Sequence, residues 1–354
     1  MKFLSQFLSP FLLFSSVASC QTDALYCGDV NTQTKVESIT KIGFGSCANQ
    51  NQNQPVLLKV LERKPDVFCW LGDNIYGDTE NMKTLIKKYS NLGCKVEFRA
   101  LNSQAHFLAV WDDHDYGAND AGKEYPMKEA SKDIFLDFWS EPQTSDRWNH
   151  SGIYHSETHG LEGQKVQFIM LDTRTFRDPL LNNDGPEWKN DYKPNYDSTA
   201  TFLGAEQWAW LETVLQEPAD LRIVMSSNQF GITYNGWEAW ANVPIERQRF
   251  IGLIKQTQAN GVVFISGDVH WAEISKQEVE NGYPLYDITS SGITQEWGST
   301  EPNDNRIGEP FRANNAGLIE INWGLGDPTI DFKVIDVSGT EVLTHQVLLS
   351  ELQF

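Results

Sequence analysis

The chain has 354 residues, of which 40% are hydrophobic and 12% aromatic, which is enough for a sizeable core and excludes disorder as the main state. Its formal net charge of -20 excludes nucleic acid and anionic membrane surfaces as partners, because both would be repelled at long range. An anionic small substrate would be repelled as well unless bound cations reverse the field locally. The acidity therefore indicates either a metal site or an adaptation for solubility.

Residues 1–20 have the pattern of a secretory signal peptide. A lone Lys2 precedes an apolar stretch, and the closing Val17-Ala18-Ser19-Cys20 resembles a bacterial lipobox, which predicts a lipid anchor on Cys20; plain cleavage near the same place is the alternative. No later segment is long enough to span a membrane. We therefore expect export by a Sec-type route to the periplasm, the extracellular space or the cell surface.

Strand-like and helix-like patterns alternate along the rest of the chain. Apolar runs predict buried strands at 42–46, 67–71, 105–111, 167–171, 222–225, 261–265 and 285–289. Apolar residues spaced by three and four predict helices at 54–63, 125–139 and 204–215. Three closing strands at 316–323, 330–337 and 342–349 have no helices between them, so we expect them to pair antiparallel.

The fold class is therefore α/β with layered helices and sheets. No internal repeat or linker divides the chain, so we predict a single domain over residues 38–350. Long polar connections at 173–201 and 290–315 either line a site or run over the surface.

Four cysteines remain if Cys20 is acylated or removed. Export would permit one disulfide, and Cys27 with Cys94 is the favoured pair because both lie in loop-like sequence, although connectivity does not follow from sequence. Cys69 lies inside an apolar strand and is expected in the core. The setting of Cys47, directly after a strand, suggests chemistry.

Polar clusters follow four of the predicted strands, at 44–47 (FGSC), 71–76 (LGDNIY), 110–115 (VWDDHD) and 265–270 (ISGDVH). Any one such cluster could be a helix cap or a turn. Four together favour a ligand site, because ligands of open α/β sheets bind outside the carboxyl ends of the strands. Aspartates that converge there would repel one another unless a cation lies between them, so the clusters predict bound metal.

These motifs resemble those of a known family. Gly72-Asp73-Asn74-Ile75-Tyr76 matches an element of purple acid phosphatases, and together with 111–115 and 267–270 it resembles the PhoD-like alkaline phosphatases of the calcineurin-like metallophosphatase superfamily. The resemblance runs from about residue 42 to residue 273. It implies a four-layer α/β/β/α sandwich with mixed sheets and a metal centre that hydrolyses phosphate esters.

The resemblance implies one metal held by Cys47, Tyr76 and His270, with Asp73 bridging to a second metal. In that family a thiolate at the position of Cys47 binds Fe³⁺. A purely structural role remains the alternative for single residues. Cys47 could be an inert core thiol or half of a disulfide, and Tyr76 could be an aromatic residue packed under a loop. Thiolate and phenolate suit iron or zinc better than calcium.

The second metal, Ca²⁺ by resemblance, would be held by Asp113, Asp268 and, as a weaker guess, Asn228. A dizinc centre would fit the same residues, and Mn or Mg are further alternatives. His114 would be free to donate to a phosphoryl oxygen or to protonate the leaving group, unless it is structural. The catalytic residues implied are thus His114 and Asp73, with Arg174.

Substrate binding is expected from Arg174 and Arg177, whose forked guanidinium groups suit phosphate oxygens, and from Trp271 as a pocket wall. Either arginine could instead pair with a loop carboxylate, and Trp271 could merely pack. The remaining histidines, at 106, 150, 155, 159 and 345, lack a motif and are expected to be structural or on the surface.

The expected function is a secreted phosphoesterase of the alkaline phosphatase type, a monomer that hydrolyses small phosphate monoesters or diesters by attack of a metal-bound hydroxide. One alternative is phosphodiesterase or phospholipase-type activity on the same centre. Another is a non-catalytic calcium-binding surface protein, although calcium binding needs none of Cys47, Tyr76, His114 and His270. Longer PhoD-like enzymes carry an additional N-terminal domain and a twin-arginine signal, and neither is found in this sequence.

Overall fold

The computed structural model describes residues 26–31, 36–183, 192–233 and 236–354. The expected signal at 1–20, with Cys20, lies outside these residues. Within them, none of the helices combines the length and the apolar character needed to cross a membrane.

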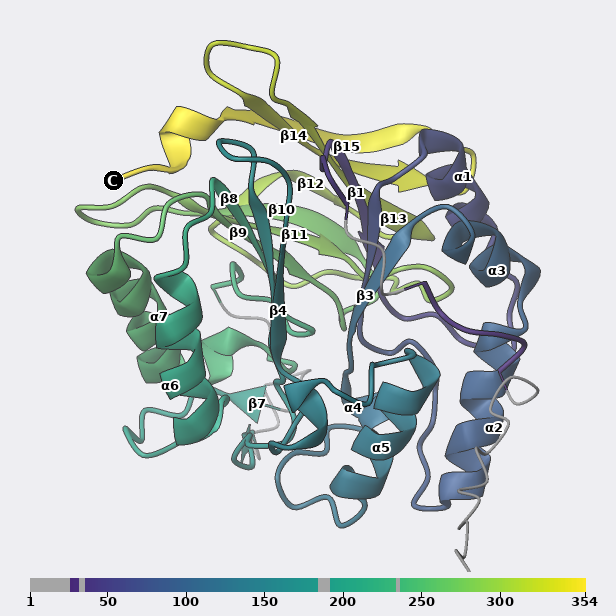
Figure 1. Cartoon of the computed structure of the whole chain (residues 1–354). Helices are drawn as coiled ribbons and strands as arrows, with labels where there is room; N and C mark the ends of the chain where they lie inside the picture. The colour runs from purple at the N-terminus through teal and green to yellow at the C-terminus, as the bar shows by residue number, and fades with distance from the viewer. Residues whose placement is uncertain (1–25, 32–35, 184–191, 234–235) are drawn as a thin grey trace, which may run out of the picture.

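Two mixed sheets form the centre of the molecule (Figure 1). The first has the order β15-β14-β13-β1-β2-β3, in which β1, β2 and β3 are parallel and β13, β14 and β15 are antiparallel. Its strands are β1 (Lys41–Gly45), β2 (Val67–Leu71), β3 (His106–Val110), β13 (Asn315–Asn322), β14 (Thr329–Asp336) and β15 (Glu341–Leu348). The predicted antiparallel pairing of the three closing strands is confirmed.

The second sheet has the order β12-β10-β11-β9-β8-β5-β4, with β5, β8, β9 and β11 parallel. Its strands are β4 (His155–His159), β5 (Val166–Met170), β8 (Leu221–Met225), β9 (Val262–Ser266), β10 (Ala272–Gln277), β11 (Leu285–Ser290) and β12 (Arg306–Phe311). A separate short pair joins β6 (Leu181–Asn182) to β7 (Tyr192–Lys193).

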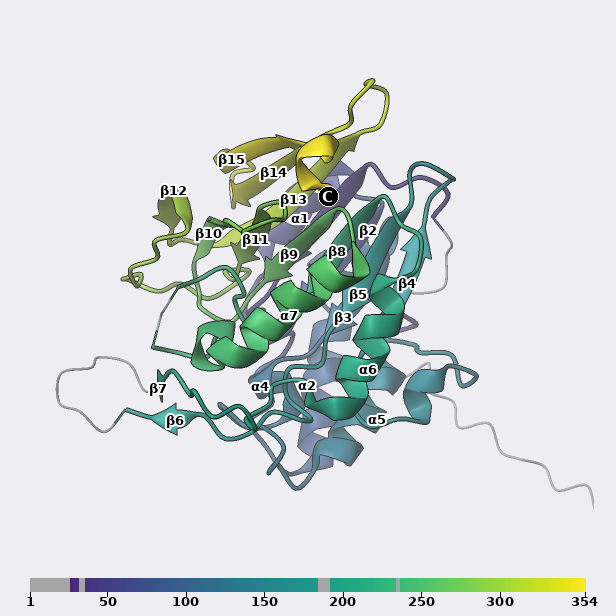
Figure 2. The ribbon, with the colours of Figure 1, turned by 90° about the vertical axis from the view of Figure 1, so that its left-hand side faces the viewer.

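Helices cover the outer face of each sheet. Figure 1 shows α1 (Pro55–Arg63), α2 (Met82–Gly93) and α3 (Val96–Asn102) beside the first sheet, and Figure 2 shows α6 (Gly204–Leu215) and α7 (Pro244–Thr257) lying across the second. The short α4 (Asp113–Tyr116) and α5 (Lys128–Phe138) follow β3. The arrangement is the expected four-layer α/β/β/α sandwich.

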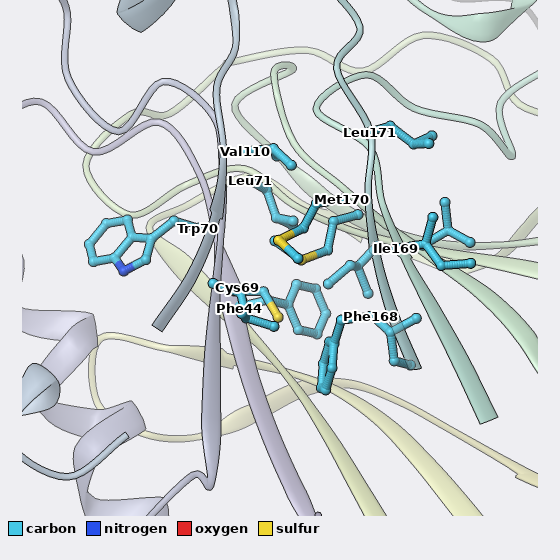
Figure 3. Packing of buried hydrophobic residues seen from close by; sticks show 14 of the residues in the cluster. Phe44, Cys69, Trp70, Leu71, Val110, Phe168, Ile169, Met170 and Leu171 are labelled. Carbon is cyan, nitrogen blue, oxygen red and sulfur yellow. The ribbon is translucent and has the colours of Figure 1, made fainter. Parts of the chain in front are cut away.

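The strand β2 shows why these sheets form from such apolar runs. All five of its residues are buried, because its two faces pack against different layers. Cys69 and Leu71 face the space between the sheets, opposite Phe168 and Met170 of β5 (Figure 3). Trp70 points the other way, onto α3, where its ring lies 5.4 Å from that of Phe98. The core position predicted for Cys69 is confirmed.

The predicted strands and helices are present, with ends that differ by up to three residues. The predicted helix at 125–139 begins only at Lys128, and Pro126 disfavours the helical conformation of the preceding Tyr125, which lies outside the helix. Strands β4, β6, β7, β10 and β12 and helices α4 and α7 were not predicted. A disulfide joins Cys27 to Cys94, as predicted, and it ties the start of the described chain to the end of α2.

Candidate metal centre

The carboxyl ends of strands from both sheets meet at one place. Cys47 follows β1, Asp73 follows β2, Asp113 follows β3, and Asp268 with His270 follows β9. The strand ends are in direct contact, since the backbone N–H of Cys47 donates to the carbonyl of Gly72 at 3.3 Å. Because β1, β2 and β3 are parallel neighbours, the predicted polar clusters that follow them lie at one edge of the sandwich.

Four of these side chains leave the strands from a left-handed backbone conformation. The φ angles are 60° at Cys47, 49° at Asp73, 74° at Asp268 and 63° at His270. Such values are uncommon outside glycine and cost free energy, so they persist where the surrounding structure holds them, often at functional sites. At each position the sharp turn swings the side chain out of the strand direction toward the shared edge.

A first group of potential ligands lies around Cys47. The ligand atoms of Cys47, Asp73 and His270 all lie within 4.8 Å of one another. The Cys47 Sγ is 3.4 Å from Asp73 Oδ2, and the Tyr76 hydroxyl is 3.2 Å from His270 Nε2. Ser291 also touches the thiol, with its Oγ 3.1 Å from Cys47 Sγ. The structure thus brings together the four residues expected to hold the first metal.

A second group shares Asp73 with the first. Ligand atoms of Asp73, Asp113 and His114 lie within 4.8 Å of one another. The His114 Nδ1 lies 2.7 Å from an Asp78 carboxylate oxygen, which fixes the orientation of the imidazole ring. Asp268 is partly buried, and it lines a pocket together with Asp113.

Several buried oxygen atoms at this edge have no hydrogen-bond partner in the part of the chain that the structure describes. They are Asp73 Oδ1, Asp113 Oδ1 and the side-chain oxygen of Asn228. Buried carboxylates without partners are costly, and several of them together repel one another. Cations bound between them would remove both costs, so the residues present fit a metal centre.

The two arginines expected at the phosphate lie elsewhere. Arg174 is fully buried and forms ion pairs with Asp112 and Glu238, and Arg177 pairs with Glu238 at 2.8 Å. Neither lines the pocket. The alternative of pairing with carboxylates is therefore what the structure shows, against the expected phosphate contact, because both guanidinium groups neutralise buried acids.

A pocket of about 220 Å³ opens onto the candidate ligands. Its lining includes Asp73, Asp113, His114, Asp268, His270 and the predicted wall residue Trp271. The remaining lining comprises Asn119, Asp120, Tyr192, Trp237, Glu238, Val269 and Trp297, all from loops except Tyr192, which begins β7.

The model of the PhoD-like phosphatase family matches residues 42–316, which include every one of these lining residues. The chain belongs to the PhoD-like phosphatase family. A curated relative, alkaline phosphatase D of Bacillus subtilis (strain 168), is 27% identical over 289 residues, which cover 71% of this chain and 48% of the relative. The chain thus spans about half the length of that relative.

Two solved structures share the fold of this PhoD-like chain. A structure of PhoD matches with a TM-score of 0.67 and 19% identity, covering 91% of this chain and 70% of that one. GAP50, the anchor in the inner membrane complex of Plasmodium, matches with a TM-score of 0.57 and 12% identity, covering 88% of this chain and 89% of that one.

Burial and crowded charge shift the acidities in this PhoD-like centre. Burial raises the pKa of the Cys47 thiol to about 12 and raises the pKa of Asp73 well above its usual range. Burial lowers the pKa of His114, but Asp73, Asp113 and Asp78 outweigh it and raise the value to about 11. A bound cation would reverse the shifts of the thiol and the carboxylate, because metal ligands bind deprotonated.

Several residues of the site were not predicted: Asp78, Asp120, Tyr192, Trp237, Glu238, Ser291 and Trp297. All except Tyr192, which begins the two-residue strand β7, lie in connections between strands and helices, where no periodic pattern shows the direction of a side chain. A weak signal existed for three of them, since Tyr192, Ser291 and Trp297 lie in the long connections expected to line a site or run over the surface.

Proposed function

We propose that the protein is an exported, metal-dependent phosphoesterase that hydrolyses small phosphate monoesters or diesters. The observation that carries the proposal is the position of Asp73, whose carboxylate belongs to both groups of potential ligands. A shared carboxylate is what a two-metal site needs to hold its ions at a short separation. Membership of a phosphatase family supports the reaction class.

The donor atoms suggest Fe³⁺ and Ca²⁺ as the metals. The first group offers the Cys47 thiolate, the Tyr76 phenolate and the His270 imidazole, which suit iron or zinc. The second group offers carboxylate oxygens of Asp73 and Asp113, and we expect Asp268 and Asn228 to add oxygen atoms to the second metal, a set that suits calcium, magnesium or manganese. The difference between the groups favours two unlike ions over a uniform pair.

Bound metals would polarise the phosphoryl group and activate water. The chain's own contribution centres on His114, whose Nδ1 is held by Asp78 at 2.7 Å and whose ring lines the pocket. The Asp78 carboxylate favours the protonated form of the imidazole, so His114 can donate to the phosphoryl or the leaving oxygen. Trp271 would shape the wall, and Arg174 would support Asp112 from below.

Export is part of the proposal, with residues 1–20 as its signal, Cys20 as a lipid anchor and residues 38–350 as one monomeric domain. The Cys27–Cys94 disulfide supports it, because disulfides persist in oxidising compartments. A purely calcium-binding role would leave Cys47, Tyr76 and His114 without a purpose in the centre.

The test is elemental analysis of the purified protein together with hydrolysis of p-nitrophenyl phosphate and bis-p-nitrophenyl phosphate. Cys47→Ala should lose the first metal and the activity together. Cys69→Ala is the matched control, because it removes the other free, buried cysteine and should keep both. Full metal content and activity in Cys47→Ala would contradict the assignment.

A further inference from the structure

The pocket contains acidic groups that the metal centre does not use. Asp120 and Glu238 both line it, and neither Lys nor Arg appears among the described lining residues. Glu238 is neutralised from behind by Arg174 and Arg177. Asp120 instead accepts a hydrogen bond from the uncharged Tyr192 hydroxyl at 2.7 Å, so its charge faces the pocket.

Aromatic rings line the same pocket as this carboxylate. Tyr192, Trp237 and Trp297, here called the aromatic wall, all line the pocket. The rings of Trp237 and Trp297 meet edge to face with centroids 6.0 Å apart, and Trp297 lies 6.2 Å from the ring of His270. The aromatic wall therefore begins next to the candidate metal ligands and continues outward.

We propose that the pocket selects phosphoesters whose alcohol carries an ammonium group, such as a choline or ethanolamine ester. This substrate class rests on the proposed function. Aromatic faces attract ammonium ions through their quadrupole, and a nearby carboxylate adds Coulomb attraction. An alcohol with a second anionic group would meet Asp120 without an arginine or lysine among the described lining residues to offset it.

The reaction itself is ordinary hydrolysis of the ester. A bond forms from a water oxygen to phosphorus, the bond from phosphorus to the ester oxygen breaks, and the amino alcohol leaves with a proton. Phosphate is the other product when the substrate is a monoester. The ammonium group takes no part in the bond changes, so its recognition is a question of specificity.

The test compares choline phosphate with 3,3-dimethylbutyl phosphate, which has the same shape without the positive charge. In the metal-loaded enzyme, kcat/KM should be at least about tenfold higher for choline phosphate. Asp120→Asn and Trp297→Leu should each lower this ratio toward one. Asparagine suits the backbone of position 120, where φ is 56°. Glu309→Gln, which removes an exposed charge outside the pocket, should leave the ratio unchanged.

Equal kcat/KM values for the two esters, with p-nitrophenyl phosphate hydrolysed normally, would overturn the inference and leave the proposed function standing. If none of the three esters is hydrolysed, both this inference and the proposed function are overturned. A preference for choline phosphate that survives both pocket substitutions would also overturn it, because the discrimination would then arise elsewhere.

Discussion

Replacement of Arg174 by glutamine should strongly destabilise the protein. The guanidinium is fully buried, its Nε donates to Asp112 Oδ1 at 2.6 Å, and it also pairs with Glu238. Removal of one partner from a buried ion pair costs about 3–5 kcal/mol, because the other charge stays buried and uncompensated. Against a total stability of about 5–15 kcal/mol, that loss is measurable and need not unfold the chain.

The assay is urea unfolding followed by tryptophan fluorescence, with inhibition by inorganic phosphate measured on the same samples. Arg63→Gln is the control, because its pair with Glu341 is about 30% exposed on each side and should contribute no more than about 1 kcal/mol. The reasoning would be refuted if Arg174→Gln lost less than about 1 kcal/mol of unfolding free energy and phosphate inhibited it much more weakly. Arg174 would then be a phosphate-binding residue, as expected from the sequence.

Three further predictions concern other parts of the molecule. Burial raises the pKa of Glu157, but hydrogen bonds from His106 and His159 outweigh it and lower the value to about 2. The wild type should therefore be more stable than Glu157→Gln above about pH 5, and this difference in unfolding free energy should shrink as the pH falls toward 3. Urea unfolding titrations at each pH measure the difference. Loss of the disulfide in Cys27→Ser/Cys94→Ser, which closes a separation of 67 residues, should cost about 4 kcal/mol in urea unfolding. Gly72→Ala should lose metal and activity, because its φ is 93° and its Cβ would lie 2.5 Å from that of Asp112; Gly163→Ala, with φ 79° and open space around it, is the control and should keep both.

The sequence was most informative where strands are buried on both faces. Such strands read as continuous apolar runs, so β2 was predicted with its full length, and the polar residues that follow it were recognisable as a strand end. The two edge strands of the second sheet, β4 and β12, were missed for the converse reason. The strand β4 reads His-Ser-Glu-Thr-His, and β12 contains a glycine and a proline, so neither has a buried apolar run to detect.

The candidate ligands were predictable because each one follows such a strand, whereas the partners of Arg174 were not. Arg174 also follows a buried strand, and a phosphate contact was a reasonable expectation for it. Its carboxylate partner Glu238 lies in a loop before α7, and nothing in the sequence shows that this loop folds back beneath Asp112. Tertiary contacts between a loop and a strand end leave no periodic signal.

The placement of charge explains how so acidic a chain can be suited to an anionic substrate. Arg174 pairs with Asp112 and Glu238, and Arg177 pairs with Glu238, so the two arginines are not available to the phosphate. The acids that face the pocket, among them Asp73, are left for bound cations. Attraction of a phosphoryl group would then depend on the metals and on protonated His114, which ties substrate binding to a correctly loaded centre.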